Sequence, residues 1–151
     1  QMAVFASTAT VHGKPLLSQI GTEALTADQW KAIKGHVSQG GKKIIELRGR
    51  SSYQSPSHQS LLMVKAVMDG LGYPWPVGCY VNTAKFRQIM MAMETTLSHS
   101  GVHYTAPHGT EEELKDLDVS YGHLAKLRDE VIAMGLLPKL EDWGKVNEHL
   151  A

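Results

Sequence analysis

The sequence predicts an α+β fold in which strands and helices are segregated along the chain. Runs of β-forming residues occupy residues 2–11 and residues 75–104, while the segments between and after them repeat apolar residues at helical spacing. The chain has 151 residues, of which 42% are hydrophobic and 20% are charged, as is usual for a soluble globular protein. We therefore expect a single domain over residues 1–151, with residues 138–151 as a C-terminal tail.

Charge and cysteine content argue against several classes of function. Fifteen Lys and Arg residues balance fifteen Asp and Glu residues, so the basic surplus of a general nucleic-acid-binding protein is absent. The one cysteine, Cys79, cannot form an intrachain disulfide, which fits a reducing compartment and predicts a cytoplasmic location. We find no run of about 18 apolar residues and no secretory signal, so we expect no membrane association.

The N-terminal residues predict a pair of short strands. Residues 2–5 are apolar, residues 7–11 continue with β-formers, and His12-Gly13-Lys14-Pro15 has the composition of a turn. Gln1 stands directly before this strand-like run, where a natural chain would begin with methionine. We therefore expect the chain to be a piece of a longer protein.

The first helix is predicted to be long and bent. Thr26 and Gln29 have the spacing of a capping box, in which each side chain accepts a hydrogen bond from the backbone of the other. Apolar residues follow at helical spacing as far as Arg48-Gly49. Gly40-Gly41 interrupts this stripe, and two glycines cost a helix about 2 kcal/mol relative to alanine. We expect a bend there, or two helices end to end.

Two further helices are marked by their first residues. Ser55 is predicted to cap the second helix, with Pro56 at its first position, and this helix is expected to end near Asp69. Residues 110–113 form another capping box, with acidic residues at the positive end of the helix dipole. The helix that they open is predicted to be long and to run to Gly135.

An antiparallel group of three strands is predicted between the second and third helices. The strands comprise residues 75–81, 89–97 and 102–104. The glycine-containing turn at residues 98–101 joins the last two strands as a hairpin.

The C-terminal tail is expected to dock through Trp143.

The histidines near this hairpin have a structural interpretation. His99 and His103 flank the turn, and together with His108 they match no closed set of metal ligands. We therefore expect solvated histidines and no metal site.

Cysteine and methionine side chains in the strands are also expected to be structural. Cys79 lies inside a predicted strand, which favours a core thiol over a catalytic one. Alternation along the strand places Met91 and Met93 on one face and Met90 on the other. This arrangement favours a sheet core or a subunit interface.

The segment from Arg48 to Ser55 is the strongest candidate for a binding site. It holds two arginines and three serines just before a predicted helix N-terminus, and these groups suit a carboxylate or a phosphate. A capped loop between two helices explains the same residues, so both interpretations stay open. Gly40-Gly41-Lys42-Lys43 lacks the spacing of a phosphate loop, and no Gly-x-Gly-x-x-Gly dinucleotide fingerprint occurs.

The same part of the chain resembles a known family. Residues 35–52, with the sequence Gly-His-Val-Ser-Gln-Gly-Gly-Lys-Lys-Ile-Ile-Glu-Leu-Arg-Gly-Arg-Ser-Ser, resemble part of the C-terminal domain of malate/L-lactate dehydrogenases. There a long bent helix ends in a Lys/Arg-Gly-x-Ser/Thr/Ala turn beside the substrate. Residues 2–5 resemble the strand after the catalytic histidine, residues 11–16 the next turn, and residues 75–81 the first strand of the sheet. Residues 111–134 resemble the C-terminal helix, and bacterial malate dehydrogenases are the closer match.

The resemblance implies that the catalytic groups lie outside this chain. In the family the glycine-rich loop, the substrate-binding arginines, the Asp-x-x-Arg motif and the catalytic histidine all precede the strand at residues 2–5, so we expect no catalytic residue here. Ser51 stands where the family has a small or hydroxyl residue that contacts the substrate. Ser55 stands where it has a usually apolar residue near the nicotinamide ring. Arg50 neighbours this pocket, and we assign it no carboxylate contact.

The function implied by the resemblance is that of the substrate half of an NAD-dependent malate dehydrogenase. Such an enzyme oxidises (S)-malate to oxaloacetate, a reaction of the tricarboxylic acid cycle. NAD is expected to bind mainly to the N-terminal domain, and the full-length enzyme is expected to be a homo-oligomer, either a dimer or a tetramer. The isolated chain is expected to be inactive. Two alternatives stay open: a substrate domain of L-lactate dehydrogenase, and a free-standing oligomerisation module derived from the family.

Overall fold

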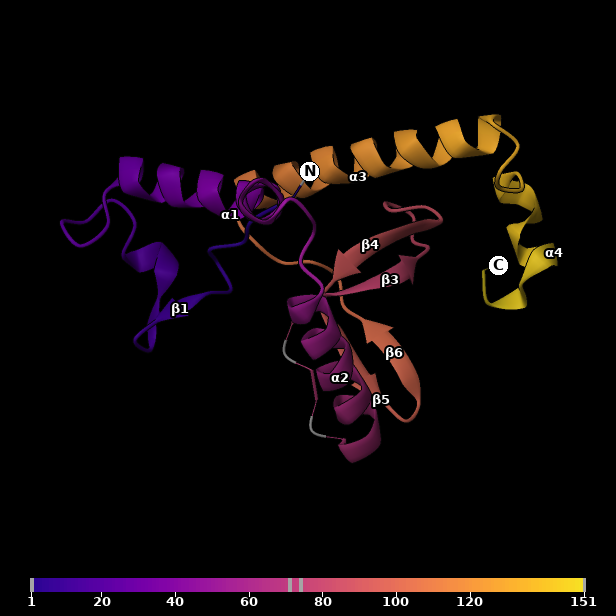
Figure 1. Cartoon of the computed structure of the whole chain (residues 1–151), viewed down its shortest axis with the longest axis horizontal. Coiled ribbons are helices and arrows are strands. Elements are labelled where there is room, and N and C mark those ends of the chain that lie inside the picture. Colours follow the sequence, from indigo (N-terminus) through magenta and orange to yellow (C-terminus); the bar gives the residue numbers. More distant parts are fainter. Residues whose placement is uncertain (1, 71, 74, 151) are drawn as a thin grey trace. The chain divides into compact units, whose positions relative to one another are not determined.

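The computed structural model describes residues 2–70, 72–73 and 75–150, and its elements confirm the α+β class (Figure 1). The chain forms two compact units. The first comprises Gln1–Val64 and His108–Leu117, and the second comprises Lys65–Pro107 and Asp118–Ala151. Helices α2 (Gln54–Asp69) and α3 (Glu111–Ala133) each contribute residues to both units.

The N-terminal strand pair is present but shorter than predicted. β1 (Thr10–Val11) pairs antiparallel with β2 (Lys14–Pro15) around His12 and Gly13, whose φ angles of 50° and 76° suit a two-residue hairpin turn. Residues 2–5 are not a strand, which corrects that part of the prediction. A strand needs a neighbouring backbone, and the backbone just after these residues hydrogen-bonds to a glutamate side chain instead.

Helix α1 (Ala27–Arg48) confirms the predicted boundaries and the bend. Thr26 Oγ1 accepts a hydrogen bond from the Gln29 N–H at 3.3 Å, and Gln29 Oε1 accepts one from the Thr26 N–H at 2.8 Å. Gly49 ends the helix in the left-handed conformation with a φ of 68°. The helix continues through Gly40-Gly41, and Figure 1 shows its first turns running across the view and its last turns seen end-on.

Helix α2 begins earlier than predicted. Its first residue is Gln54, so Ser55 lies inside the first turn and does not cap the helix. Pro56 is tolerated there because the first N–H groups of a helix have no intrahelical partner. The helix ends at Asp69, as predicted, and Gly70 follows with a φ of 66°.

Helix α3 begins at the predicted capping box. The Thr110 N–H donates to Glu113 Oε2 at 2.8 Å, and the Glu113 N–H donates to Thr110 Oγ1 at 3.3 Å. The helix ends at Ala133, and Gly135 follows with a φ of 73°. Its acidic first turn and left-handed glycine are the boundaries that the sequence predicts.

The strands of the second unit form two antiparallel pairs, not one group of three. β3 (Val77–Val81) pairs with β4 (Ile89–Met93), and β5 (Thr95–Ser98) pairs with β6 (Gly101–Tyr104) as the predicted hairpin. The predicted strand over residues 89–97 is divided at Glu94, whose carbonyl accepts a hydrogen bond from the Thr105 N–H at 3.0 Å. The residues before Val77 lie outside β3, and Trp75 is 55% exposed.

Alternate residues of β3 and β4 build the core of the second unit. The buried side chains are Val77, Cys79 and Val81 from β3, and Ile89, Met91 and Met93 from β4. Met90, on the opposite face, is 59% exposed. The predicted alternation is therefore confirmed, and it places the methionines of one face in the core.

The C-terminal tail docks on β3 as predicted. It consists of η2 (Leu140–Asp142), α4 (Trp143–Val146) and η3 (Glu148–Leu150). The rings of Trp143 and Tyr80 lie 6.3 Å apart, and the Tyr80 hydroxyl donates to the Leu150 carbonyl at 2.8 Å. Both contacts lie within the second unit.

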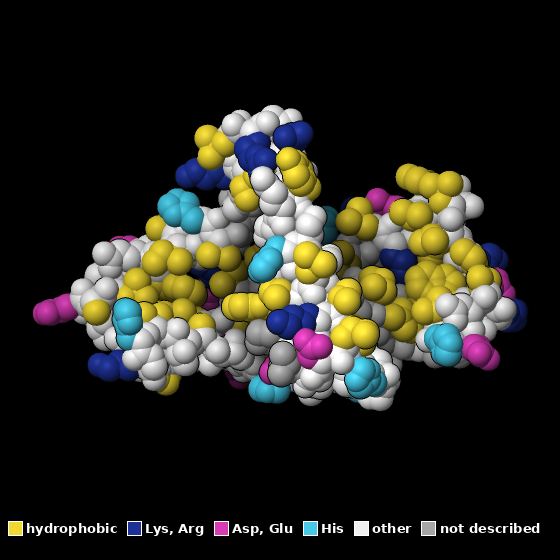
Figure 2. All heavy atoms as spheres, turned by 60° about the horizontal axis from the view of Figure 1, so that its bottom comes forward, with side chains coloured by type: hydrophobic (Ala, Val, Ile, Leu, Met, Phe, Trp, Pro, Cys, Tyr) yellow, Lys and Arg dark blue, Asp and Glu magenta, His cyan; other side chains and the backbone are white. Residues whose placement is uncertain are grey.

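The apolar stripe of α1 is present but uncovered. The helix buries none of its residues, and the exposed fractions of Ile33, Val37 and Ile44 are 43%, 47% and 39%. Figure 2 shows hydrophobic side chains spread over the visible surface. Among the described residues, no helix has both the length and the apolar content needed to cross a membrane.

Candidate functional site

The loop between α1 and α2 holds both predicted site residues. Gly49 closes α1, and α2 begins only five residues later at Gln54. Ser51 lies in the loop and Ser55 in the first turn of α2, and both are exposed. A ligand can therefore reach both serines.

Two arginines, one at the end of α1 and one in the loop, pack on one tyrosine ring. The Cζ atoms of Arg48 and Arg50 lie 5.6 Å and 5.1 Å from the centroid of the Tyr53 ring, within the range of cation–π contacts. Arg48 also donates to Gln54 Oε1 at 2.9 Å. In the part of the chain that the structure describes, neither arginine has an ion-pair partner. Among the described residues, no carboxylate therefore neutralises the charge of these two guanidinium groups.

This arrangement suits an anionic ligand. Guanidinium groups that already rest on a ring lose less freedom when they bind an oxyanion, and the exposed serine hydroxyls can donate further hydrogen bonds. The N-terminus of α2 adds a partial positive charge. The geometry fits both interpretations of residues 48–55. Gly49 caps α1, as a capped loop requires, and this cap uses neither guanidinium group, so both groups can also face an anion.

Glu113 is a buried carboxylate in the same unit. Its side chain is 5% exposed and accepts hydrogen bonds from the N–H groups of Ala6 at 2.6 Å, Ser7 at 3.0 Å and Thr110 at 2.8 Å. Burial by itself raises the pKa of this carboxyl group, and the polar groups of these three residues outweigh it, so the pKa lies below its ordinary value. The carboxylate is therefore ionised at neutral pH.

Gly109 makes a close approach beside this carboxylate. A Cβ atom at this position would lie 2.7 Å from Glu113 Oε2 and 2.7 Å from a carbon of the Phe5 ring. No larger residue fits without a shift of these neighbours. The glycine thus allows residues 5–7 to pack directly against the start of α3.

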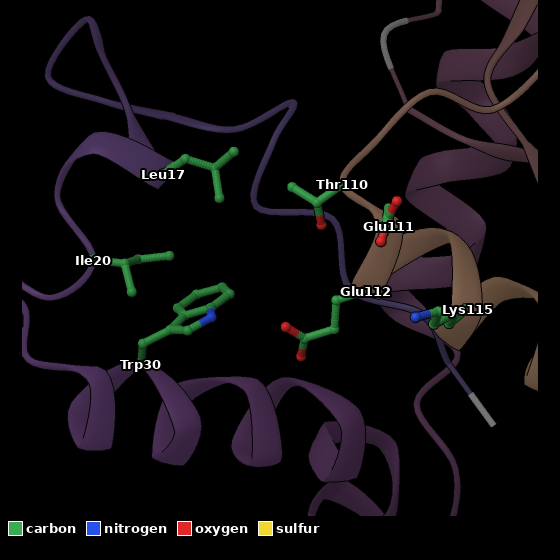
Figure 3. Close-up of a pocket in the computed structure, with 7 residues that line it drawn as sticks. All are labelled: Leu17, Ile20, Trp30, Thr110, Glu111, Glu112 and Lys115. Atoms are coloured by element: carbon green, nitrogen blue, oxygen red, sulfur yellow. The ribbon is translucent and has the colours of Figure 1, made fainter.

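A shallow pocket of about 600 Å³ opens near the start of α1. It is lined by Leu17, Ile20, Trp30, Thr110, Glu111, Glu112 and Lys115. Figure 3 shows the apolar side chains of Leu17, Ile20 and Trp30 on one side and those of Thr110 and Glu112 facing them. The pocket includes neither Ser51 nor Ser55, so it is separate from the candidate site.

The histidine and cysteine side chains lie where the sequence predicts them. His99 and His103 are exposed at the β5–β6 hairpin, and His103 Nε2 lies 3.3 Å from Ser100 Oγ. Cys79 is 7% exposed, and burial raises the pKa of its thiol, which disfavours the reactive thiolate. Within residues 2–70, 72–73 and 75–150, no group of three or more His, Cys, Asp or Glu side chains could hold a metal ion.

Comparison with known proteins identifies the family. A family model described as the lactate/malate dehydrogenase, alpha/beta C-terminal domain matches residues 1–134. The chain belongs to this family. Its fold is therefore that of the C-terminal domain of these dehydrogenases, as the resemblance implied. No curated protein sequence matches the chain.

Solved structures of both branches of the family share this fold. Malate dehydrogenase from Aeropyrum pernix is 22% identical, with a TM-score of 0.72 over 83% of this chain and 41% of its own. Lactate dehydrogenase from Cryptosporidium parvum is also 22% identical, with a TM-score of 0.70 over 81% of this chain and 41% of its own. Malate dehydrogenase from Plasmodium falciparum in complex with NADH is 17% identical, with a TM-score of 0.70 over 85% of this chain and 43% of its own. The chain thus spans about two fifths of the length of these dehydrogenases.

Two features of this lactate/malate dehydrogenase domain were not predicted from the sequence. The stacking of Arg48 and Arg50 on Tyr53 depends on side-chain conformations in an irregular loop, for which no sequence rule was available. The capping box correctly predicted the contact between Glu113 and Thr110, but the contact with Ala6 spans more than a hundred residues. The sequence feature closest to this contact is Gly109, which stands directly before the helix cap although no turn at that position requires a glycine.

Proposed function

We propose that this chain is the substrate domain of a bacterial NAD-dependent malate dehydrogenase, which reversibly oxidises (S)-malate to oxaloacetate. Family membership supports a dehydrogenase of 2-hydroxy acids. The observation that carries the proposal is the match of residues 1–134 to the lactate/malate dehydrogenase C-terminal domain, together with the exposed Ser51 in the loop after α1. Malate is chosen over lactate because residues 35–52 resemble the malate branch of the family more closely.

The residues of this chain orient the substrate in this proposal. Ser51 contacts the substrate through its hydroxyl group, and its position at the end of α1 restricts where the substrate lies. The histidine that takes the proton of the malate hydroxyl precedes residue 2 in the full-length enzyme. NAD, held mainly by the N-terminal domain, accepts the hydride. Ser55 lies near the nicotinamide ring, where its exposed position leaves room for a ring and its hydroxyl replaces the usual apolar contact.

A homo-oligomer in the cytoplasm, either a dimer or a tetramer, is part of the same proposal. The uncovered stripe that includes Ile33, Val37 and Ile44 can pack against a second copy or against the N-terminal domain, and the proposal assigns it to a second copy. Light scattering on the full-length protein would show at least twice the mass of one chain. A monomer at micromolar concentration would contradict this part of the proposal.

The activity of the full-length protein tests the proposed reaction. We expect NAD reduction with (S)-malate to exceed that with (S)-lactate. Preference for lactate would support the lactate dehydrogenase alternative, and no activity with either would contradict the proposal and favour an oligomerisation module. The isolated chain is expected to be inactive, so turnover by a pure sample would show that essential groups lie within residues 1–151.

Substitution of Ser51 tests its contact with the substrate. Ser51→Trp is expected to reduce kcat/KM for malate by at least about tenfold, because a bulky ring displaces the substrate. Ser98→Trp is the matched control, since Ser98 ends β5 in the second unit. Equal losses in the two variants would remove Ser51 from the pocket.

A further inference from the structure

Glu113 joins two segments that are distant in the sequence. One carboxylate oxygen, Oε1, accepts hydrogen bonds from the N–H groups of Ala6 and Ser7 at 2.6 Å and 3.0 Å. The other, Oε2, accepts the Thr110 N–H at 2.8 Å. Oε1 thus binds the segment that follows residues 2–5, and Oε2 binds the N-terminus of α3.

A helix cap alone does not require this carboxylate. The capping box of α1 has Gln29 in the equivalent place, and its single amide oxygen accepts the Thr26 N–H. A glutamine side chain has one acceptor oxygen and an NH₂ group that only donates, whereas a carboxylate has two acceptor oxygens. The second oxygen of Glu113 is therefore committed to the long-range contact with Ala6 and Ser7.

We infer that Glu113 is a positioning residue that fixes residues 5–7 and, through them, the histidine that precedes residue 2. The inference rests on the proposed function, which places that histidine there. Phe5 adds a second attachment, because its ring packs against Gly109 so closely that a Cβ atom there would lie 2.7 Å away. Ser51 belongs to the same compact unit as these residues. Glu113 thus limits the variation in distance between the histidine and a substrate held at Ser51.

The test compares Glu113→Gln with Thr110→Ala in the full-length protein. Glu113→Gln offers one acceptor oxygen to two segments, so one of them must lose its hydrogen bond. Thr110→Ala removes the hydroxyl that accepts the Glu113 N–H at 3.3 Å, while both carboxylate oxygens keep their partners. Glu113→Asp keeps the charge on a shorter side chain, and it replaces Glu113→Gln if the latter does not fold. The readouts are hydrogen exchange at the Ala6, Ser7 and Thr110 amides, kcat and KM.

Glu113→Gln is expected to speed exchange at Ala6 and Ser7 by at least about tenfold, because these amides lose a buried acceptor. It is expected to lower kcat by about tenfold to hundredfold while KM changes less than about threefold, because a misplaced histidine slows the reaction more than it weakens binding. Thr110→Ala is expected to leave all three readouts near those of the unchanged protein.

Three results would overturn the inference. Unchanged exchange at all three amides bound by the carboxylate, those of Ala6, Ser7 and Thr110, in Glu113→Gln would exclude the anchoring contact, whatever the activity. An equal loss of kcat in Thr110→Ala would assign the effect to the helix cap. Faster exchange with unchanged kcat would show that the anchored segment does not position the histidine. A full-length protein without dehydrogenase activity would instead refute the proposed function and with it the catalytic role, leaving the exchange result to decide on the anchor alone.

Discussion

The Nζ atom of Lys34 lies 2.7 Å from Oδ2 of Asp116, and this ion pair joins α1 to the first turns of α3 within the first unit. Glu112 adds a longer contact to the same ammonium group at 3.5 Å. The hydrogen bond to Asp116 raises the pKa of Lys34, although partial burial opposes this change. Since both side chains are partly exposed, solvent screens the pair and its contribution to stability is modest.

A double-mutant cycle with Lys34→Met and Asp116→Asn measures this contribution. We expect a coupling energy of about 0.2–1 kcal/mol, which decreases at about 1 M salt because exposed charges are screened. The raised pKa of Lys34 places the stabilisation below the unfolded-state pKa of lysine, and the stabilisation is lost as the pH rises through the folded-state value. Lys42 and Glu46, 3.8 Å apart and well exposed, form the control pair. A larger coupling in the control pair would contradict the assignment.

Glu113 makes the stability of the first unit depend on pH in the acidic range. Its folded-state pKa is below its ordinary value, so the unfolded chain binds the proton more tightly. The stabilisation is therefore complete above the unfolded-state pKa and is lost as the pH falls through the folded-state pKa. Urea unfolding from about pH 7 to about pH 3 should show unchanged protein and Glu113→Gln converging as the pH decreases. A difference that stays constant over this range would argue against an ionised Glu113.

Gly109→Ala is expected to destabilise the protein by about 1–3 kcal/mol, because the added methyl group overlaps the Phe5 ring and the Glu113 carboxylate. Gly122→Ala is the matched control, since Gly122 lies inside α3 and a Cβ atom there meets nothing within 4 Å. This control is expected to stabilise the helix by up to about 1 kcal/mol. Thermal unfolding of both variants measures the difference, and a neutral Gly109→Ala would show that the approach is not close.

The two faces of β4 predict opposite responses to truncation. Met91→Ala is expected to cost about 2–5 kcal/mol, because Met91 is 5% exposed and its removal leaves a cavity in the second unit. Met90→Ala, at a position that is 59% exposed, is expected to change stability by less than about 0.5 kcal/mol. Denaturant unfolding of the full-length protein compares them. A large loss for Met90→Ala would indicate that a partner covers this face.

The elements that could be predicted from the sequence are those that depend on residues close together in the chain. Both capping boxes and the left-handed Gly49 involve contacts across at most four residues, so their residue types predicted them directly. The alternation of Met90 and Met91 follows in the same way from the period of a strand. Helix boundaries and strand faces were therefore predictable.

The remaining differences arise from contacts between distant residues. An apolar run such as residues 89–97 does not indicate where its pairing partner changes, and the division at Glu94 depends on Thr105. Residues 2–5 have strand composition, but the backbone after them pairs with the Glu113 side chain. Ser55 has the preferences of a helix cap, yet α2 already begins at Gln54. Of the candidate site, the loop could be located from sequence, but not the arginines stacked on Tyr53.

The two glycines at the bend of α1 have an evolutionary consequence. Neither would meet another atom within 4 Å if it carried a Cβ, so alanine is sterically allowed at both positions. The pair lowers helix stability by about 2 kcal/mol relative to alanine, a deficit that a single substitution at each site could remove. A lineage adapting to high temperature therefore has a ready source of heat resistance in Gly40 and Gly41. If its members keep both glycines, the curvature of this helix is under selection in its own right.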